Sequence, residues 1–159
     1  MVKERAPATP AVHFLRENGV DFRTHFYKYE RSGAVLAAEK LGVDPHSVIK
    51  TLVMEDDSGN PFIVLMHGDR DVSLKQLARE LGVRSVSTAS VKDAQRYTGY
   101  RVGGISPFGS RRELPVYVEE SLLRLPTVYI NAGRRGFIVE ISPGEIVRLL
   151  GARSVNAAI

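Results

Sequence analysis

A lysine inside an apolar run is the first residue of this sequence whose type and position suit chemistry. Lys50 lies in the run from Val48 to Met54, whose β-branched and apolar residues predict a strand. Because side chains alternate between the two faces of a strand, Lys50 shares a face with Val48, Leu52 and Met54, where an unpaired charge is costly. Two interpretations stay open: an ammonium that reaches water on its aliphatic stem, or a fixed cation that holds a phosphate or polarises a carbonyl.

A pair of adjacent glycines is the second candidate. Gly103 and Gly104 open the segment Gly103-Gly104-Ile105-Ser106-Pro107. Because glycine has no Cβ, the backbone amides of this segment could approach an ester carbonyl or a phosphate and donate hydrogen bonds, as an oxyanion hole does. An ordinary flexible loop is the alternative interpretation.

A basic turn is the third candidate. The segment Asn131-Ala132-Gly133-Arg134-Arg135-Gly136 follows an apolar run and ends in two arginines and a glycine. One interpretation is a hairpin turn with solvated arginines. The other is a polar substrate wall beside a phosphate-binding patch.

Several classes of catalytic site are absent from the sequence. It contains no cysteine, which excludes a protein thiolate nucleophile and cysteine-bound metal, and no serine lies in a nucleophile elbow or a Walker loop. The four histidines, His13, His25, His46 and His67, lack metal-ligand spacing, so we interpret them as structural or surface residues and predict no metal or cofactor. Any catalysis would therefore depend on positioning and electrostatics.

Short helices and strands alternate along the chain that must position these candidates. Helices are predicted from Pro10, capped by Thr9, to before Gly19, and at 34–41, 73–81, 90–97 and 143–150. Strands are predicted at 21–29, 48–54, 62–66, 83–88, 114–118, 127–131 and 137–141, the second and third forming a hairpin. Because no helix regularly follows each strand, we expect an α+β fold with a mixed, mostly antiparallel, barrel-like sheet flanked by short helices.

Size and charge fit one basic domain. The chain has 159 residues, 43% of them hydrophobic, so residues 1–159 are expected to form a single domain. The formal net charge is +4, and the stretch 96–135 holds seven arginines against three acidic residues, which permits a polyanionic partner. The charged N-terminus has no apolar segment of a signal peptide, and no run is long enough to span a bilayer, so we expect a cytoplasmic protein without a membrane partner.

Taken together, these segments resemble one known family. Lys50-Thr51-Leu52, the run 98–109 and Gly133-Arg134-Arg135-Gly136 closely resemble the YbaK family of aminoacyl-tRNA deacylases, which is related to the editing domain of bacterial prolyl-tRNA synthetases. The resemblance extends from Thr9 to the final helix. It implies a compact α+β fold around a barrel-like sheet and an activity that removes a wrongly attached amino acid from tRNA.

The resemblance also implies roles for particular residues. The family lysine falls on Lys50, which would anchor the acylated 3′ end, and Gly103 and Gly104 would hold the scissile ester through their amides. The remaining predicted contacts fall into two sets. Substrate-binding residues would be Tyr27, which follows His25 by two, with Thr51, Ile105, Ser106, Pro107, Asn131 and Gly133. The tRNA phosphates would be neutralised by Arg101, Arg111, Arg112, Arg134 and Arg135.

Two departures from the family pattern bear on which amino acid is removed from the tRNA. The segment 31–35 carries no aromatic residue, and Asn131 replaces a serine common before the basic turn. Cysteine from Cys-tRNA(Pro) is the favoured substrate. The ester would be cleaved either by hydrolysis, as in a hydrolase, or by attack of the cysteine's own thiol, as in a lyase. The alternatives are an Ala-tRNA(Pro) deacylase that uses water, a tRNA- or nucleotide-binding module without catalysis, and an accessory subunit of prolyl-tRNA synthetase.

Overall fold

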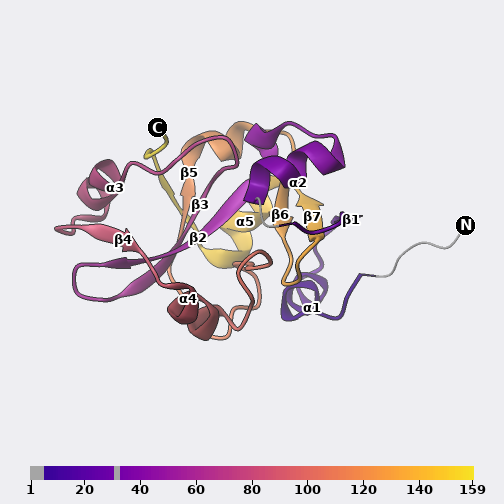
Figure 1. Ribbon diagram of the computed structural model, residues 1–159, viewed down its shortest axis with the longest axis horizontal. Helices are drawn as coiled ribbons and strands as arrows, with labels where there is room; N and C mark the ends of the chain where they lie inside the picture. The colour runs from indigo at the N-terminus through magenta and orange to yellow at the C-terminus, as the bar shows by residue number, and fades with distance from the viewer. Residues whose placement is uncertain (1–5, 31–32) are drawn as a thin grey trace, which may run out of the picture.

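The strands form two sheets that lie side by side (Figure 1). The computed structural model describes residues 6–30 and 33–159. One sheet is antiparallel with the order β1-β7-β6, and the other is mixed with the order β4-β2-β3-β5-β8. The strands are β1 Arg23–Phe26, β2 Ile49–Asp56, β3 Pro61–His67, β4 Val86–Thr88, β5 Val116–Glu119, β6 Val128–Asn131, β7 Phe137–Ile141 and β8 Arg153–Val155. The pairs β3–β5 and β5–β8 are parallel and the other pairs are antiparallel, which confirms the predicted mixed α+β class.

Short helices flank the sheets. They are α1 Pro10–Glu17, α2 Gly33–Leu41, α3 Leu74–Leu81, α4 Val91–Thr98 and α5 Pro143–Leu150, with two 3₁₀ turns, η1 Pro45–Ser47 and η2 Glu120–Arg124. Helices α1, α3 and α4 begin after a hydroxyl side chain that caps the first turn. At the start of α1, Thr9 Oγ1 accepts a hydrogen bond of 3.1 Å from the Val12 N–H. Ser73 and Ser90 cap α3 and α4 in the same way. These caps confirm the predicted helix starts, because each satisfies a backbone donor that the first turn leaves free.

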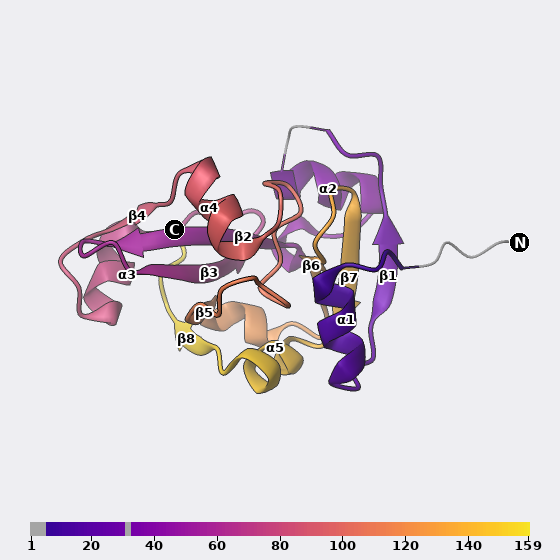
Figure 2. The same cartoon turned by 90° about the horizontal axis from the view of Figure 1, so that it is seen from below.

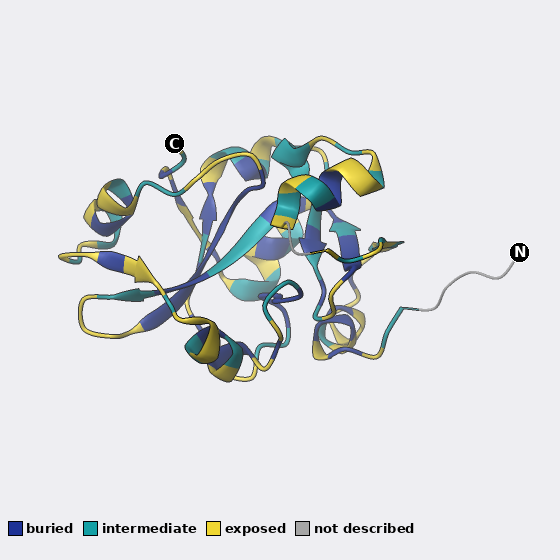
Figure 3. Cartoon of the chain, viewed as in Figure 1, coloured by how far each residue is buried: buried dark blue, intermediate teal, exposed yellow. Residues whose placement is uncertain are grey.

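The β2–β3 hairpin forms the centre of the molecule. Its register runs from the Ile49–His67 pair to the Glu55–Pro61 pair, as the predicted hairpin requires. All seven residues of β3 are buried, and Figure 3 shows the exposed residues gathered on the outer helices and turns. Figure 2 shows α1 beside the three-stranded sheet and α3 with β4 at the opposite end of the molecule.

The two sheets meet at a single described bridge. Val48, directly before β2, pairs in parallel with Tyr129 of β6. Beyond this bridge the two strands run in the same direction but belong to separate sheets. The predicted barrel-like sheet is thus divided, and the opening between β2 and β6 leaves room for a site.

Several elements of the fold differ from the predicted ones, and the strands predicted at 83–88 and 114–118 are β4 Val86–Thr88 and β5 Val116–Glu119. The strand predicted at 21–29 forms a ladder only over β1, because its partner β7 begins at Phe137, opposite Phe26. Beyond that point Tyr27 keeps one backbone hydrogen bond, from its N–H to the carbonyl of Gly136 at 3.0 Å. The sequence patterns did not predict strand β8 or the turn η2. Strand β8 has only three residues and forms by pairing with β5, which is distant in the sequence.

Candidate active site

A small cavity lies where β2 and β6 separate, beneath α2. Its volume is about 240 Å³. Lys50 and Asn131 each lie two residues beyond the Val48–Tyr129 bridge on strands that run in the same direction, so both reach this cavity. The lining consists of Tyr27, Tyr29, Gly33, Ala34, Ala37, Val48, Ile49, Lys50, Thr51, Leu52, Gly103, Asn131 and Ile138. The structure therefore brings together five of the predicted site residues, from four separate segments of the chain. We call this cavity the Lys50 pocket.

The charge of Lys50 is partnered in this structure. Its ammonium lies 3.3 Å from Oδ1 of Asp71, with 26% of the lysine side chain and 86% of the aspartate side chain exposed. Asp71 is held by the C-terminal residue, since it exchanges backbone hydrogen bonds with Ile159 in both directions, at 3.1 and 2.9 Å. Because the aspartate side of this ion pair is exposed, the pair contributes little to stability, and an incoming anion can replace the carboxylate at small cost.

Thr51 carries a buried polar atom that lacks a partner. Within residues 6–30 and 33–159, its Oγ1 is the one buried side-chain oxygen or nitrogen without a hydrogen bond. A buried hydroxyl without a partner costs about 1–3 kcal/mol. Thr51 is among the residues that line the Lys50 pocket, and we predict that a bound substrate supplies the partner of this hydroxyl.

This hydroxyl yields a prediction in which stability and activity change in opposite directions. Thr51→Val is expected to raise the free energy of unfolding by about 1 kcal/mol, because it removes an unsatisfied buried group while keeping the shape. Deacylation by the same variant should fall about tenfold, the equivalent of about 1.4 kcal/mol of binding in the transition state. Urea unfolding and single-turnover deacylation measure the two effects, with Thr51→Ser as the control that keeps the hydroxyl. Full activity in Thr51→Val would show that the hydroxyl does not bind substrate.

Two tyrosines and Asn131 complete the polar lining. Burial, and to a smaller extent the neighbouring Tyr29, raise the pKa of Tyr27 above its ordinary value. The Tyr27 phenol therefore stays protonated at neutral pH and can donate a hydrogen bond. Asn131, at the end of β6, is half-buried and can both donate and accept through its amide.

The two glycines of the predicted oxyanion loop differ in what they can offer. Gly103 lines the pocket with φ +100°, and a Cβ there would collide with the ring and hydroxyl of Tyr29. Gly104 is buried, and a Cβ there would lie 2.8 Å from the backbone carbon of Arg134. Its N–H already donates to the Arg101 carbonyl at 3.0 Å, and its own carbonyl accepts from the Gly133 N–H at 3.0 Å. Gly104 thus lets the loop pack against the basic turn, and Gly103 is the one of the two glycines that lines the pocket.

Four other residues predicted to bind substrate lie outside the lining of the Lys50 pocket. Ile105, Ser106 and Pro107 are buried and do not line the Lys50 pocket. The Ser106 hydroxyl accepts a hydrogen bond of 3.2 Å from the Phe108 N–H, so it shapes the loop. Gly133 is absent from the pocket lining as well.

Comparison with known proteins identifies the family. Residues 30–149 match the family model described as the aminoacyl-tRNA editing domain. The chain belongs to this family. The predicted membership is therefore confirmed, and the predicted enzyme class, aminoacyl-tRNA deacylase, is the class of this family.

Individual relatives of this editing domain agree with that result. The chain is 28% identical over 149 residues to the "Putative Cys-tRNA(Pro)/Cys-tRNA(Cys) deacylase EbsC" of Enterococcus faecalis, covering 92% of this chain and 91% of that protein. It is 32% identical over 106 residues to the proline–tRNA ligase of Moorella thermoacetica. This match covers 66% of this chain and 18% of the ligase. The fold resembles the "Crystal structure of a putative trans-editing enzyme for prolyl tRNA synthetase", with a TM-score of 0.84 at 24% identity, covering 98% and 99% of the two chains. None of the helices in the described part of the chain is long and apolar enough to cross a membrane.

The arginines predicted to bind tRNA are exposed and lie on loops of the editing domain. Arg134 and Arg135 form the turn that packs against the glycine loop, and the Arg135 Nε–H donates to the carbonyl of Val102 at 2.8 Å. Arg101 lies at the start of that loop. Arg111 and Arg112 follow its far end and are held through their backbone N–H groups by the last residues of α4. Their contacts with tRNA stay a prediction.

Sequence spacing missed a cluster of histidines beside this site. The rings of His46 and His67 stack with centroids 3.7 Å apart, and Asp69 accepts from the His46 ring at 2.9 Å. The ligand atoms of these three residues lie within 4.8 Å of one another. Both ring nitrogens of His67 are engaged, however, one with the His46 carbonyl and the other with the Ser121 hydroxyl, each at 2.6 Å. The cluster therefore acts first as a hydrogen-bonded support between η1, β3 and η2.

His67, the buried residue of this cluster, is expected to make the stability of the fold depend on pH. Burial is the main cause that lowers the pKa of His67 below 6.5, with a contribution from His46, although the His46 carbonyl, Asp69 and Glu119 oppose it. The unfolded chain thus takes up a proton at a higher pH than the folded chain, so stability is full above pH 6.5 and falls as the pH drops below it. The slope for one proton is at most about 1.4 kcal/mol per pH unit.

Urea unfolding at a series of pH values from 7.5 to 5 measures this slope. His67→Gln should be less stable at pH 7.5 but should show a flatter curve, because the buried titrating group is gone. An identical slope in the two proteins would place the titration elsewhere.

Proposed function

We propose that this chain acts as a single editing domain that removes a misattached amino acid from tRNA, with cysteine on tRNA(Pro) as its preferred substrate. One observation carries the proposal. The Lys50 pocket, a cavity of about 240 Å³, is lined by Lys50, by Gly103 and by Thr51, whose buried hydroxyl has no hydrogen-bond partner. The name of the Enterococcus faecalis relative supports the choice of cysteine. Charging of tRNA takes place in the cytoplasm, so we place the protein there.

Each residue of the pocket then has a role suited to its chemistry. Lys50 exchanges Asp71 for the terminal phosphate or the aminoacyl group of the tRNA 3′ end. The N–H of Gly103 donates to the carbonyl oxygen of the scissile ester, where negative charge develops during the reaction. Tyr27 and Asn131 contact the amino acid or the ribose, and the Thr51 hydroxyl gains the hydrogen bond it lacks.

The substrate itself supplies the nucleophile in the cysteine reaction. The cysteinyl sulfur attacks the carbonyl carbon of its own ester, forming a C–S bond as the bond between that carbon and the ribose oxygen breaks. The thiol proton ends on the released ribose hydroxyl. The pocket accelerates this step by holding sulfur and carbonyl in reacting geometry, which needs no nucleophilic side chain.

A pair of matched substrates tests this function. The protein is mixed with tRNA(Pro) carrying cysteine, 2-aminobutyrate, alanine or proline, and loss of the acyl group is followed. Cysteine and 2-aminobutyrate differ mainly in the thiol, so rapid release of cysteine alone supports attack by the substrate thiol. Equal release of 2-aminobutyrate or alanine supports hydrolysis by water instead.

The remaining outcomes separate the alternative functions. If no acyl-tRNA is cleaved but tRNA binds, the chain is a binding module. If cleavage requires added prolyl-tRNA synthetase, the chain is an accessory subunit that takes its tRNA specificity from this partner.

A further inference from the structure

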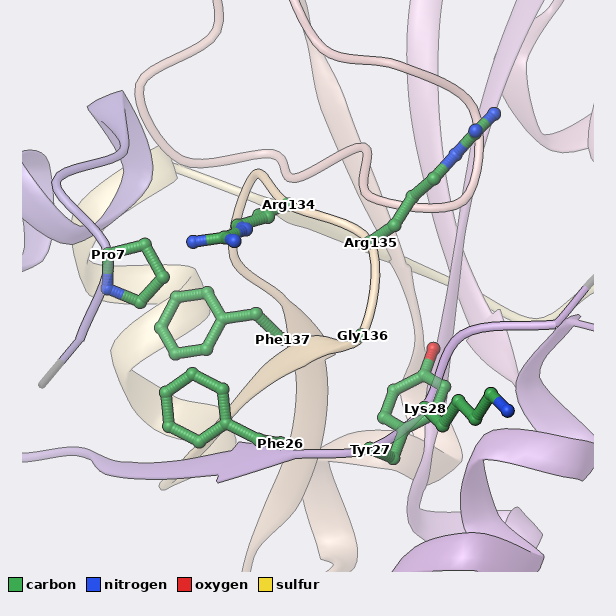
Figure 4. A pocket seen from close by; sticks show the side chains of 8 residues that line it. All are labelled: Pro7, Phe26, Tyr27, Lys28, Arg134, Arg135, Gly136 and Phe137. Atoms are coloured by element: carbon green, nitrogen blue, oxygen red, sulfur yellow. The ribbon is translucent and has the colours of Figure 1, made fainter. Parts of the chain in front are cut away.

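A second, larger groove lies next to the Lys50 pocket, across the end of β1. Its volume is about 630 Å³. Figure 4 shows the lining residues, which are Pro7, Phe26, Tyr27, Lys28, Arg134, Arg135, Gly136 and Phe137. We call it the Phe26 groove. It adjoins the Lys50 pocket, because Tyr27 lines both cavities.

The floor of this groove is aromatic. The rings of Phe26 and Phe137 stack with centroids 5.1 Å apart and an angle of 29° between their planes. Phe137 is buried, whereas 36% of Phe26 is exposed, so one side of the stack is open to the groove. Figure 4 shows both rings next to Pro7, while the Tyr27 ring lies further along the strand, away from Pro7.

The rim of the groove is positively charged. Three cationic residues, Lys28, Arg134 and Arg135, are among the lining residues, which include no carboxylate. Figure 4 shows the Arg134 side chain extending over the aromatic floor towards Pro7. Arg135 is fixed by its hydrogen bond to Val102 and by stacking on the ring of Tyr29, 5.0 Å from the ring centroid. Within the described residues, neither Lys28 nor Arg134 forms an ion pair.

An open aromatic face beside cations is the arrangement that binds unpaired nucleotides. Any of the four bases can stack on an aromatic ring, and the cations neutralise the phosphate next to that base. An acidic or neutral peptide would not need the flat open face, and a paired RNA helix could not insert a base. The chemistry therefore favours a single-stranded segment of RNA.

We propose that the Phe26 groove binds the unpaired nucleotide that precedes the aminoacylated adenosine of tRNA, with its base stacked on Phe26 and its phosphate beside Arg134. This inference rests on the proposed function, because that function places the terminal adenosine at the Lys50 pocket. Tyr27 separates the two cavities, so consecutive nucleotides can occupy them. The groove adds affinity for the single-stranded 3′ end without taking part in the cleavage step.

Binding of two RNA hairpins tests the proposal directly. One hairpin ends in a single-stranded 3′ CCA segment, and the other is the same stem cut back to a blunt end. Phe26→Ala is expected to weaken binding of the first about tenfold and to leave the second unchanged, as measured by fluorescence anisotropy. Phe26→Tyr keeps the ring and should bind normally. Leu74→Ala, which removes an exposed apolar side chain from α3 at the far end of the molecule, is the matched control.

A parallel activity measurement separates this inference from the proposed function. Phe26→Ala should raise KM for cysteinyl-tRNA(Pro) about tenfold and leave the cleavage of a 3′-cysteinyl adenosine unchanged, because that ester lacks the preceding nucleotide. Wild-type protein that cleaves neither substrate would overturn the proposed function, while the hairpin titration still decides the groove. Equal binding of the 3′ CCA hairpin by wild type and Phe26→Ala, or equal loss on both hairpins, would overturn the groove assignment.

Discussion

Lys50→Ala is expected to lower kcat/KM for deacylation about 100-fold, the equivalent of about 2.7 kcal/mol. A hydrogen bond to a charged group contributes about 1.5–3 kcal/mol, which accounts for a loss of this size. The fold should be almost unchanged, because the Lys50–Asp71 ion pair is exposed on the aspartate side. Single-turnover deacylation and urea unfolding of the same preparation measure both effects.

A second lysine provides a matched control for this variant. Lys40 has a similar exposure, 24% against 26%, and also pairs with one carboxylate, Glu30. It does not line the Lys50 pocket, so Lys40→Ala should keep its activity within about twofold. An unchanged rate in Lys50→Ala would refute the role given to this lysine. A similar loss in both variants would point to a general effect of charge on tRNA binding.

Gly103→Ala is expected to lower the deacylation rate at least about tenfold. The residue has φ +100°, and an added methyl group would collide with Tyr29, so the loop must move and carry its N–H away from the ester. The strained backbone should also cost about 1–2 kcal/mol of stability. Activity is measured on cysteinyl-tRNA and stability by urea unfolding.

Another glycine separates strain from catalysis in this experiment. Gly59, in the turn between β2 and β3, has φ +79° and no atom within 4 Å of an added Cβ. Gly59→Ala should lose a comparable amount of stability and keep full activity, because this turn does not line the Lys50 pocket. If Gly103→Ala were equally destabilised but fully active, the amide of Gly103 would have no part in the reaction.

Local patterns in the sequence predicted the parts of the fold that neighbouring residues determine. Thr9 and Ser73 begin helices because their hydroxyls cap the N–H groups three residues later. The β2–β3 hairpin follows from two apolar runs around the turn at 56–60. The resemblance to the YbaK family predicted that Lys50 and the glycine loop belong to one site. In the structure, Lys50 and Gly103 both line the same pocket.

Contacts between distant segments could not be predicted in this way. The pairing of Lys50 with Asp71 depends on backbone bonds between Asp71 and Ile159, which no local pattern encodes. Gly104 looks like a ligand-binding glycine in sequence, but its role is set by the turn at Arg134 that packs against it. The departure noted at 31–35 lies partly on residues 31 and 32, outside the described residues. Gly33 and Ala34 of that segment do line the pocket.

The backbone at the Val48–Tyr129 bridge helps to determine which size of amino acid the Lys50 pocket admits. The Lys50 pocket exists because two strands that touch at this bridge belong to different sheets and separate beyond it. The width of the pocket therefore depends on how far apart the two strands lie, in addition to the side chains that line it. A relative with identical lining residues would admit a larger amino acid if these two strands lay further apart. Discrimination between amino acids that differ by one atom can thus change with the spacing of the backbone strands as well as with the lining side chains.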